Sequence, residues 1–111
     1  WIGHNMSDLR GGIDQGINAL GGEIESRGGW VEIGFKAASW VTLYLGYSND
    51  DPENHDLPTT GRANNRIIYG AAVMNFGAVT FGVEYLNFTT EYVAFEQGVA
   101  NQVKLYAAYN F

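Results

Sequence analysis

Residues 30–48 read WVEIGFKAASWVTLYLGYS, and this stretch decides the fold class of the chain. Apolar residues occupy every second position up to residue 37, and the same alternation resumes at residue 40 after a short break at Ala38–Ser39. A period of two is typical of β-strands, because successive side chains of a strand point to opposite sides of the sheet. The stretch therefore predicts two antiparallel strands joined by a tight turn.

The same alternation recurs along the rest of the chain. We expect further strands over residues 66–76, 79 to about 89, and 102–111. The faces of 66–76 (RIIYGAAVMNF) stay unassigned, because both are apolar. The connections alternate in length: short at Ala38–Ser39 and around Gly77, long and polar over 49–65 and about 90–101. The sequence thus predicts an all-β, antiparallel, up-and-down arrangement of about five strands.

Strand length and loop asymmetry point to a membrane. Each expected strand has about 9–11 residues, which is the length that crosses a bilayer when the strand is tilted by about 40°. Short turns at one end and long polar loops at the other are typical of outer-membrane barrels. The alternating apolar faces carry no charge, whereas the opposite faces are too polar for a soluble two-sided core. We therefore interpret the strands as a segment of a transmembrane β-barrel.

The last nine residues, VKLYAAYNF, resemble the C-terminal β-signal of bacterial outer-membrane proteins. That signal is a final strand with alternating hydrophobic residues and a terminal aromatic residue. The hairpin GAVTFGVEYLNFTTEY (77–92) also looks like the penultimate strand of general porins. The resemblance covers residues 28–111 and implies recognition by the barrel-assembly machinery during insertion. The positions that match the signal are Val103, Leu105, Ala107, Tyr109 and Phe111.

The resemblance also implies a location and a function. The C-terminus would be periplasmic, the loops 49–65 and 90–101 extracellular, and the outer-membrane lipid would cover the apolar faces. The chain would form part of a porin wall for passive diffusion of small hydrophilic solutes, and a homotrimer would be common for such a protein. The lumen would be lined by Glu32, Lys36, Thr42, Tyr44, Glu84, Lys104, Tyr106 and Asn110. Equally, the lumen charges could form ion pairs with each other that stabilise the barrel wall.

Two other functions are compatible with the sequence. One is a barrel without an open pore that serves as an anchor or scaffold, and the other is a soluble β-rich binding module. Five strands cannot close a single-chain barrel, which has an even count of eight or more strands. We therefore expect further strands before Trp1 in a longer chain, with a barrel shared by several copies as the second option.

Residues 1–27 differ from the rest of the chain. Apolar residues fall at steps of three and four, which is helical spacing, and the glycines at 21 and 22 would end a helix. Three earlier glycines oppose a helix. We expect a loop with a short helix, on the long-loop side of the barrel. The apolar residues in question are Met6, Leu9, Ile13, Ile17 and Leu20.

Little in the composition indicates catalysis or cofactor binding. The net charge of −6 argues against a nucleic-acid partner, and the absence of cysteine excludes thiol chemistry and cysteine-bound metals. The acidic segment SNDDPENHD (48–56) does not follow the calcium-loop spacing, so we interpret it as a solvated loop. No nucleophile motif or dinucleotide fingerprint is present. The sequence predicts no enzyme, no cofactor and no metal site.

Overall fold

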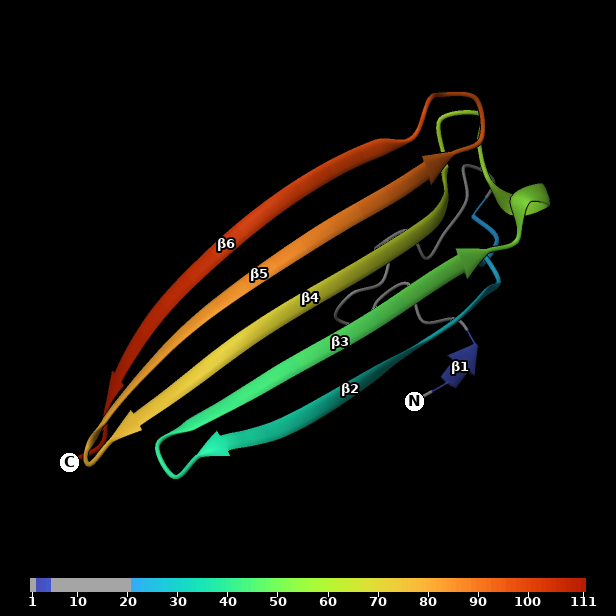
Figure 1. Ribbon diagram of the computed structural model, residues 1–111. Coiled ribbons are helices and arrows are strands. Elements are labelled where there is room, and N and C mark those ends of the chain that lie inside the picture. The colour runs from blue at the N-terminus through green and yellow to red at the C-terminus, as the bar shows by residue number, and fades with distance from the viewer. Residues whose placement is uncertain (1, 5–20) are drawn as a thin grey trace.

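The computed structural model describes residues 2–4 and 21–111. One antiparallel sheet holds all the strands in chain order (Figure 1). A single turn of 3-10 helix, η1 (Asn54–Asp56), lies between the third and fourth strands. The strands are β1 (Ile2–His4), β2 (Ser26–Ala38), β3 (Val41–Pro52), β4 (Arg62–Phe76), β5 (Val79–Tyr92) and β6 (Gly98–Tyr109). The prediction of an all-β, antiparallel, up-and-down fold is confirmed.

The strands are longer than the sequence predicted, with 12 to 15 residues in each of β2 to β6. Much of the predicted long loops is paired backbone, so the loops shrink to residues 53–61 and 93–97. Polar side chains at the strand ends do not prevent pairing, and Thr90 donates a hydrogen bond to Asn65 there, at 2.8 Å. The boundary expected at residue 28 falls inside β2, which begins at Ser26.

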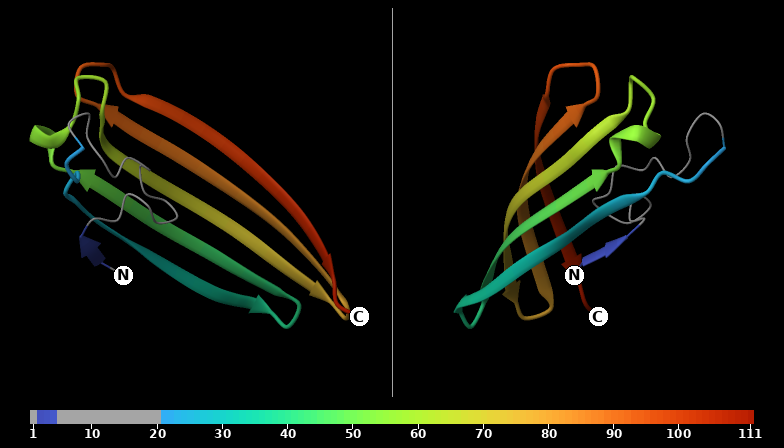
Figure 2. Two further views of the ribbon diagram at one scale, coloured as in Figure 1. Left: turned by 180° about the vertical axis from the view of Figure 1, so that it is seen from behind. Right: turned by 90° about the vertical axis from the view of Figure 1, so that its right-hand side faces the viewer.

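Both short turns lie at one end of the sheet, and both loops lie at the other (Figures 1 and 2). The turn between β4 and β5 is Gly77–Ala78, and Gly77 has a φ of 62°, which glycine adopts without steric cost. The turn between β2 and β3 is Ser39–Trp40, one residue later than predicted. An irregular register between Lys36 and Ala38 accompanies this shift.

The strand β1 was not predicted. It lies within the segment expected to be a loop and pairs with β2 through Ile2 and Gly29. Three residues are too few for an alternation to be recognised. The helix expected over residues 6–20 lies outside the described residues. No helix in the described part of the chain is long and apolar enough to cross a membrane.

The register assigns the faces of β4 that the sequence left open. Gly70 lies opposite Leu45, and Ala71 lies opposite Tyr44. On the other side, Ala71 lies opposite Glu84. Gly70 therefore shares the face of Leu45, and Ala71 shares the face of Glu84. The sheet is a single twisted and curved layer with β1 and β6 at its open edges (Figure 2).

Candidate functional site

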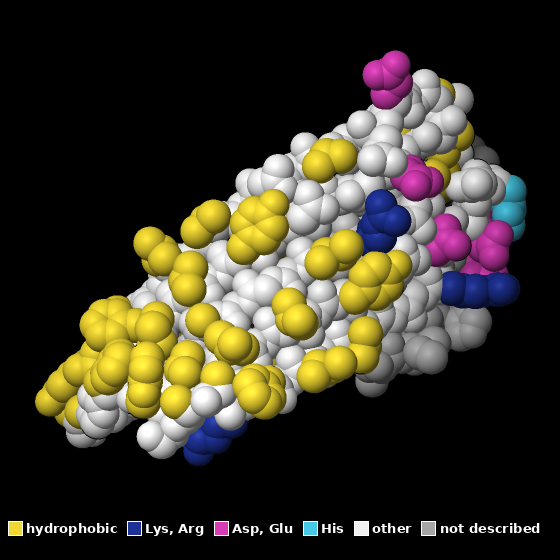
Figure 3. Space-filling model, viewed as in Figure 1, with side chains coloured by type: hydrophobic (Ala, Val, Ile, Leu, Met, Phe, Trp, Pro, Cys, Tyr) yellow, Lys and Arg dark blue, Asp and Glu magenta, His cyan; other side chains and the backbone are white. Residues whose placement is uncertain are grey.

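One side of the sheet, the apolar face, carries a continuous uncharged band that runs from the short turns up to the row of Val31, Tyr47 and Ile68. Figure 3 shows hydrophobic side chains over the short-turn part of the sheet and most acidic and basic side chains at the loop end. Large side chains on this face are strongly exposed, including Ile33 (70%), Leu45 (69%) and Leu105 (78%). The register places the residues of this band side by side in rows across the sheet. Counted from the short turns, the rows are Phe76, Val79 and Tyr109; Val41, Met74, Phe81 and Ala107; Phe35, Leu43, Ala72, Val83 and Leu105; Ile33, Leu45, Gly70, Tyr85 and Val103; and Val31, Tyr47 and Ile68.

The height of this apolar band follows from the register. Along β5 the band begins at Val79, and its last row reaches the level of Asn87. The eight steps from Val79 to Asn87 span about 27 Å at roughly 3.4 Å per residue. A tilt of about 40° projects this length to about 21 Å, close to the apolar band of about 25 Å in transmembrane barrels.

The opposite side, the polar face, carries the mid-sheet charges. The register brings seven of the eight sequence-predicted lumen residues into three adjacent rows. Asn110 lies beyond β6, and its backbone N–H donates to the Ala78 carbonyl at 2.9 Å. Counted from the loop end, the three rows are Glu32, Gly46, Tyr69, Leu86 and Gln102; Gly34, Tyr44, Ala71, Glu84 and Lys104; and Lys36, Thr42, Val73, Gly82 and Tyr106.

Two of the four mid-sheet charges neutralise each other. Glu84 and Lys104 are directly opposite across β5 and β6, and Lys104 Nζ lies 3.5 Å from Glu84 Oε2. Glu32 accepts a hydrogen bond from the Tyr69 hydroxyl at 2.6 Å. Lys36 forms no ion pair with any residue that the structure describes. The sequence left open whether charges on this face pair with each other. In the structure Glu84 and Lys104 do form such a pair.

The Glu84–Lys104 pair should stabilise the sheet only slightly, because its side chains are 24% and 41% exposed. A double-mutant cycle with Glu84→Gln and Lys104→Gln is expected to give a coupling energy of about 0.2–1 kcal/mol. Unfolding free energies of the wild type, both single variants and the double variant would measure it. Added salt should reduce the coupling, and a coupling indistinguishable from zero at low salt would contradict a stabilising role.

Three tyrosines of the polar face lie over glycines on the neighbouring strand. Tyr44 lies opposite Gly34, and a Cβ added to Gly34 would be 3.1 Å from its ring. Tyr69 contacts the position of a Cβ on Gly46, and Tyr106 does the same on Gly82. Glycine thus leaves room for each ring to lie along the sheet. Tyr69 was not predicted to lie on this face, because apolar residues occupy both faces of β4.

Aromatic side chains gather at the short-turn end. The rings of Trp40 and Phe76 stack with centroids 5.4 Å apart, and Phe81 lies 6.4 Å from Phe76. Tyr109 and Phe111 stack at 6.2 Å. Val103, Leu105, Ala107 and Tyr109 lie on the apolar face, while Phe111 follows the strand and is fully exposed.

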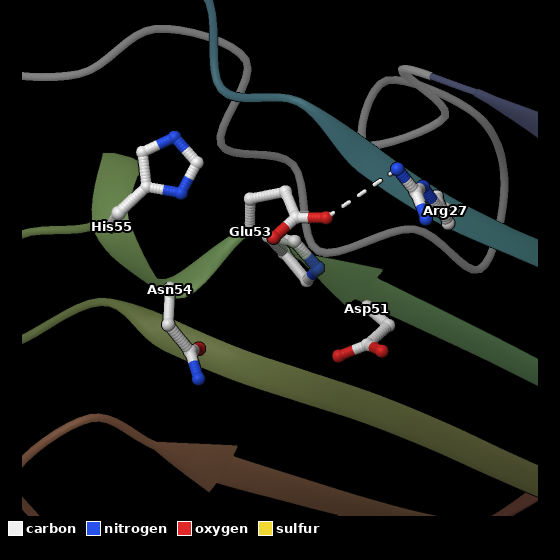
Figure 4. A pocket seen from close by; sticks show the side chains of 6 residues that line it. Arg27, Asp51, Glu53, Asn54 and His55 are labelled. Atoms are coloured by element: carbon white, nitrogen blue, oxygen red, sulfur yellow. Dashed lines mark ion pairs between the residues drawn. The ribbon is translucent and has the colours of Figure 1, made fainter.

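Charged side chains also cluster around a polar hollow at the loop end (Figure 4). It is lined by Arg27, Asp51, Pro52, Glu53, Asn54 and His55. Arg27 of β2 lies 3.7 Å from Glu53 and 3.6 Å from Glu25, so two nearby carboxylates compensate its charge. Within residues 2–4 and 21–111, no three His, Asp or Glu side chains are placed to hold a metal ion.

The two faces are therefore the features from which a function can be inferred. Comparison with known proteins adds nothing to them: no family model, no curated protein and no solved structure matches this chain.

Proposed function

We propose that this chain forms part of the wall of a β-barrel in a bacterial outer membrane, where the polar face lines a passage for small hydrophilic solutes. The observation that carries the proposal is the separation of the two faces. An uncharged band of membrane height covers one side of the sheet, and Glu32, Lys36, Glu84 and Lys104 all lie on the other. A charge at mid-depth on the lipid side costs roughly 2–4 kcal/mol for a basic group, which supports lipid contact with the apolar face only.

The open edges of the sheet agree with a barrel wall that further strands complete. Backbone groups in hydrocarbon must be hydrogen-bonded within the protein, so β1 and β6 need further strands beside them in a membrane. Strands outside this chain, or further copies of it, would supply them. In the proposed orientation the short turns face the periplasm and the two loops face outward, as in barrels with asymmetric loops.

Passive diffusion requires only a wet wall and no catalytic group. The polar face offers hydroxyl, amide and charged groups, and its charges are balanced in sign. Such a wall would discriminate weakly between solutes of opposite charge.

A barrel without an open passage is a second candidate. Ile67 and Leu86 lie on the polar face, yet each is only 7% exposed, so the loop-end part of this face is covered. In that case the protein would act as an anchor or scaffold in the membrane.

Conductance across a planar bilayer would test the proposal. The native polypeptide that carries this chain would be purified in detergent from the outer-membrane fraction, and discrete ohmic current steps are expected after insertion. A protein that inserts stably without current steps would refute the pore and support the anchor. A protein that remains monodisperse after detergent removal would refute membrane residence and support a soluble binding module.

A further inference from the structure

Arg66 lies on the apolar face immediately beyond the apolar band. By register it stands between Asn49 of β3 and Thr89 of β5, one step closer to the loops than Ile68. Its side chain is exposed. Arg66 forms no ion pair with any described residue, whereas Arg27 of the same face is paired with Glu25 and Glu53. Arg66 is therefore an uncompensated cation at the edge of the band.

Two amides lie one row nearer the band, on β5 and β6. Asn87 and Asn101 are directly opposite each other on β5 and β6. The Tyr85 hydroxyl and the Asn87 side-chain amide both donate to Asn101 Oδ1, each at 2.8 Å. Oδ1 accepts both bonds, and the Nδ2 group of Asn101 donates to no described residue. The edge of the band thus presents hydrogen-bond donors with one positive charge.

Carboxylates of this face lie farther from the band. Asp51 is opposite Arg27, and Glu91 is opposite Asn64, so both stand beyond Arg66 on the loop side. Between them and the band is a zone with donors and no acidic side chain. On its other side, Ile68 (51% exposed) and Tyr47 (41% exposed) continue the apolar surface.

We propose that Arg66 binds the phosphate of an anionic membrane lipid. The inference rests on the proposed membrane location, because the ligand must approach from the lipid side. A guanidinium group matches a phosphate with two parallel hydrogen bonds, and its aliphatic stem can lie along apolar surface while the charged end stays in the headgroup layer. The acyl chains of the same lipid would lie over Ile68 and Tyr47.

Lipid retention measured by native mass spectrometry would test this site. The native polypeptide would be incubated in detergent with equal amounts of phosphatidylglycerol and phosphatidylcholine, and the ratio of the two bound lipids counted. The wild type is expected to prefer phosphatidylglycerol. Arg66→Gln should reduce this ratio about fivefold, which corresponds to about 1 kcal/mol for one basic side chain near an anionic surface. Arg66→Lys should keep most of the preference.

Lys36→Gln is the matched control, since it removes one positive charge from the polar face. Its lipid ratio should equal that of the wild type. An unchanged ratio in Arg66→Gln, or an equal loss in Lys36→Gln, would overturn the lipid site and leave the barrel proposal intact. A wild type that is soluble without detergent would instead refute the proposed function itself.

Discussion

Leu43→Arg is expected to destabilise the membrane-inserted protein by about 2–4 kcal/mol. Leu43 lies in the middle row of the apolar band, on the central strand β3, and is 42% exposed toward the proposed lipid side. An arginine there would place a charge near the centre of the hydrocarbon layer. Urea-induced unfolding in lipid vesicles, followed by tryptophan fluorescence, would give the free energy of unfolding.

Thr42→Arg is the control for this prediction. Thr42 precedes Leu43 on the same strand and lies on the polar face, opposite Lys36. The same arginine would face water in the proposed lumen, so its cost should be limited to repulsion from Lys36 and stay below about 1 kcal/mol. Equal effects of the two substitutions would contradict the assignment of lipid and water to the two faces.

Gly28→Ala is expected to destabilise the sheet by about 1–3 kcal/mol. Gly28 pairs with Asp50, and an added Cβ would overlap the backbone oxygen of Asn49 and lie 3.1 Å from the Asp50 Cα. These are backbone atoms of β3, so the clash can be relieved only by moving one strand away from the other. Equilibrium unfolding in detergent would measure the loss.

Gly70→Ala provides the comparison, because the nearest atom to its added Cβ is 3.5 Å away and belongs to the Leu45 side chain. This is an ordinary contact, and alanine loses less conformational entropy than glycine on folding. The variant should be neutral or more stable by up to about 1 kcal/mol. Equal destabilisation by both alanines would show that the close approach of β2 and β3 at Gly28 is not the cause.

The alternation of apolar residues was sufficient to predict β2, β3, β5 and β6 and to place Leu45 and Tyr44 on opposite faces. It also predicted a strand at 66–76, within β4, but not the faces of that strand, because Ile67 and Ile68 are both apolar and only pairing with neighbouring strands separates the faces. It also ended the strands early, because Asn49 to Pro52 looks like a polar loop although its backbone continues the ladder. Backbone hydrogen bonding does not depend on side-chain polarity.

For the candidate site, the sequence predicted which residues share the polar face but not what they contact. Tyr69 and its hydrogen bond to Glu32 depend on the relative register of β2, β3 and β4, which no local pattern contains. The glycines under Tyr69 and Tyr106 were visible in the sequence only as weak strand formers. The acidic segment 48–56 was expected to be a solvated loop, yet Asp50 is only 2% exposed.

The connectivity of the sheet affects how quickly its hairpins form. From β2 to β6, every strand pairs only with its neighbours in the chain, so each of these pairings closes a short turn or loop. Closing the two-residue turns Ser39–Trp40 and Gly77–Ala78 costs less chain entropy than closing the loops 53–61 and 93–97. The β2–β3 and β4–β5 hairpins should therefore form first as kinetic units, and their docking across the longer loops should follow.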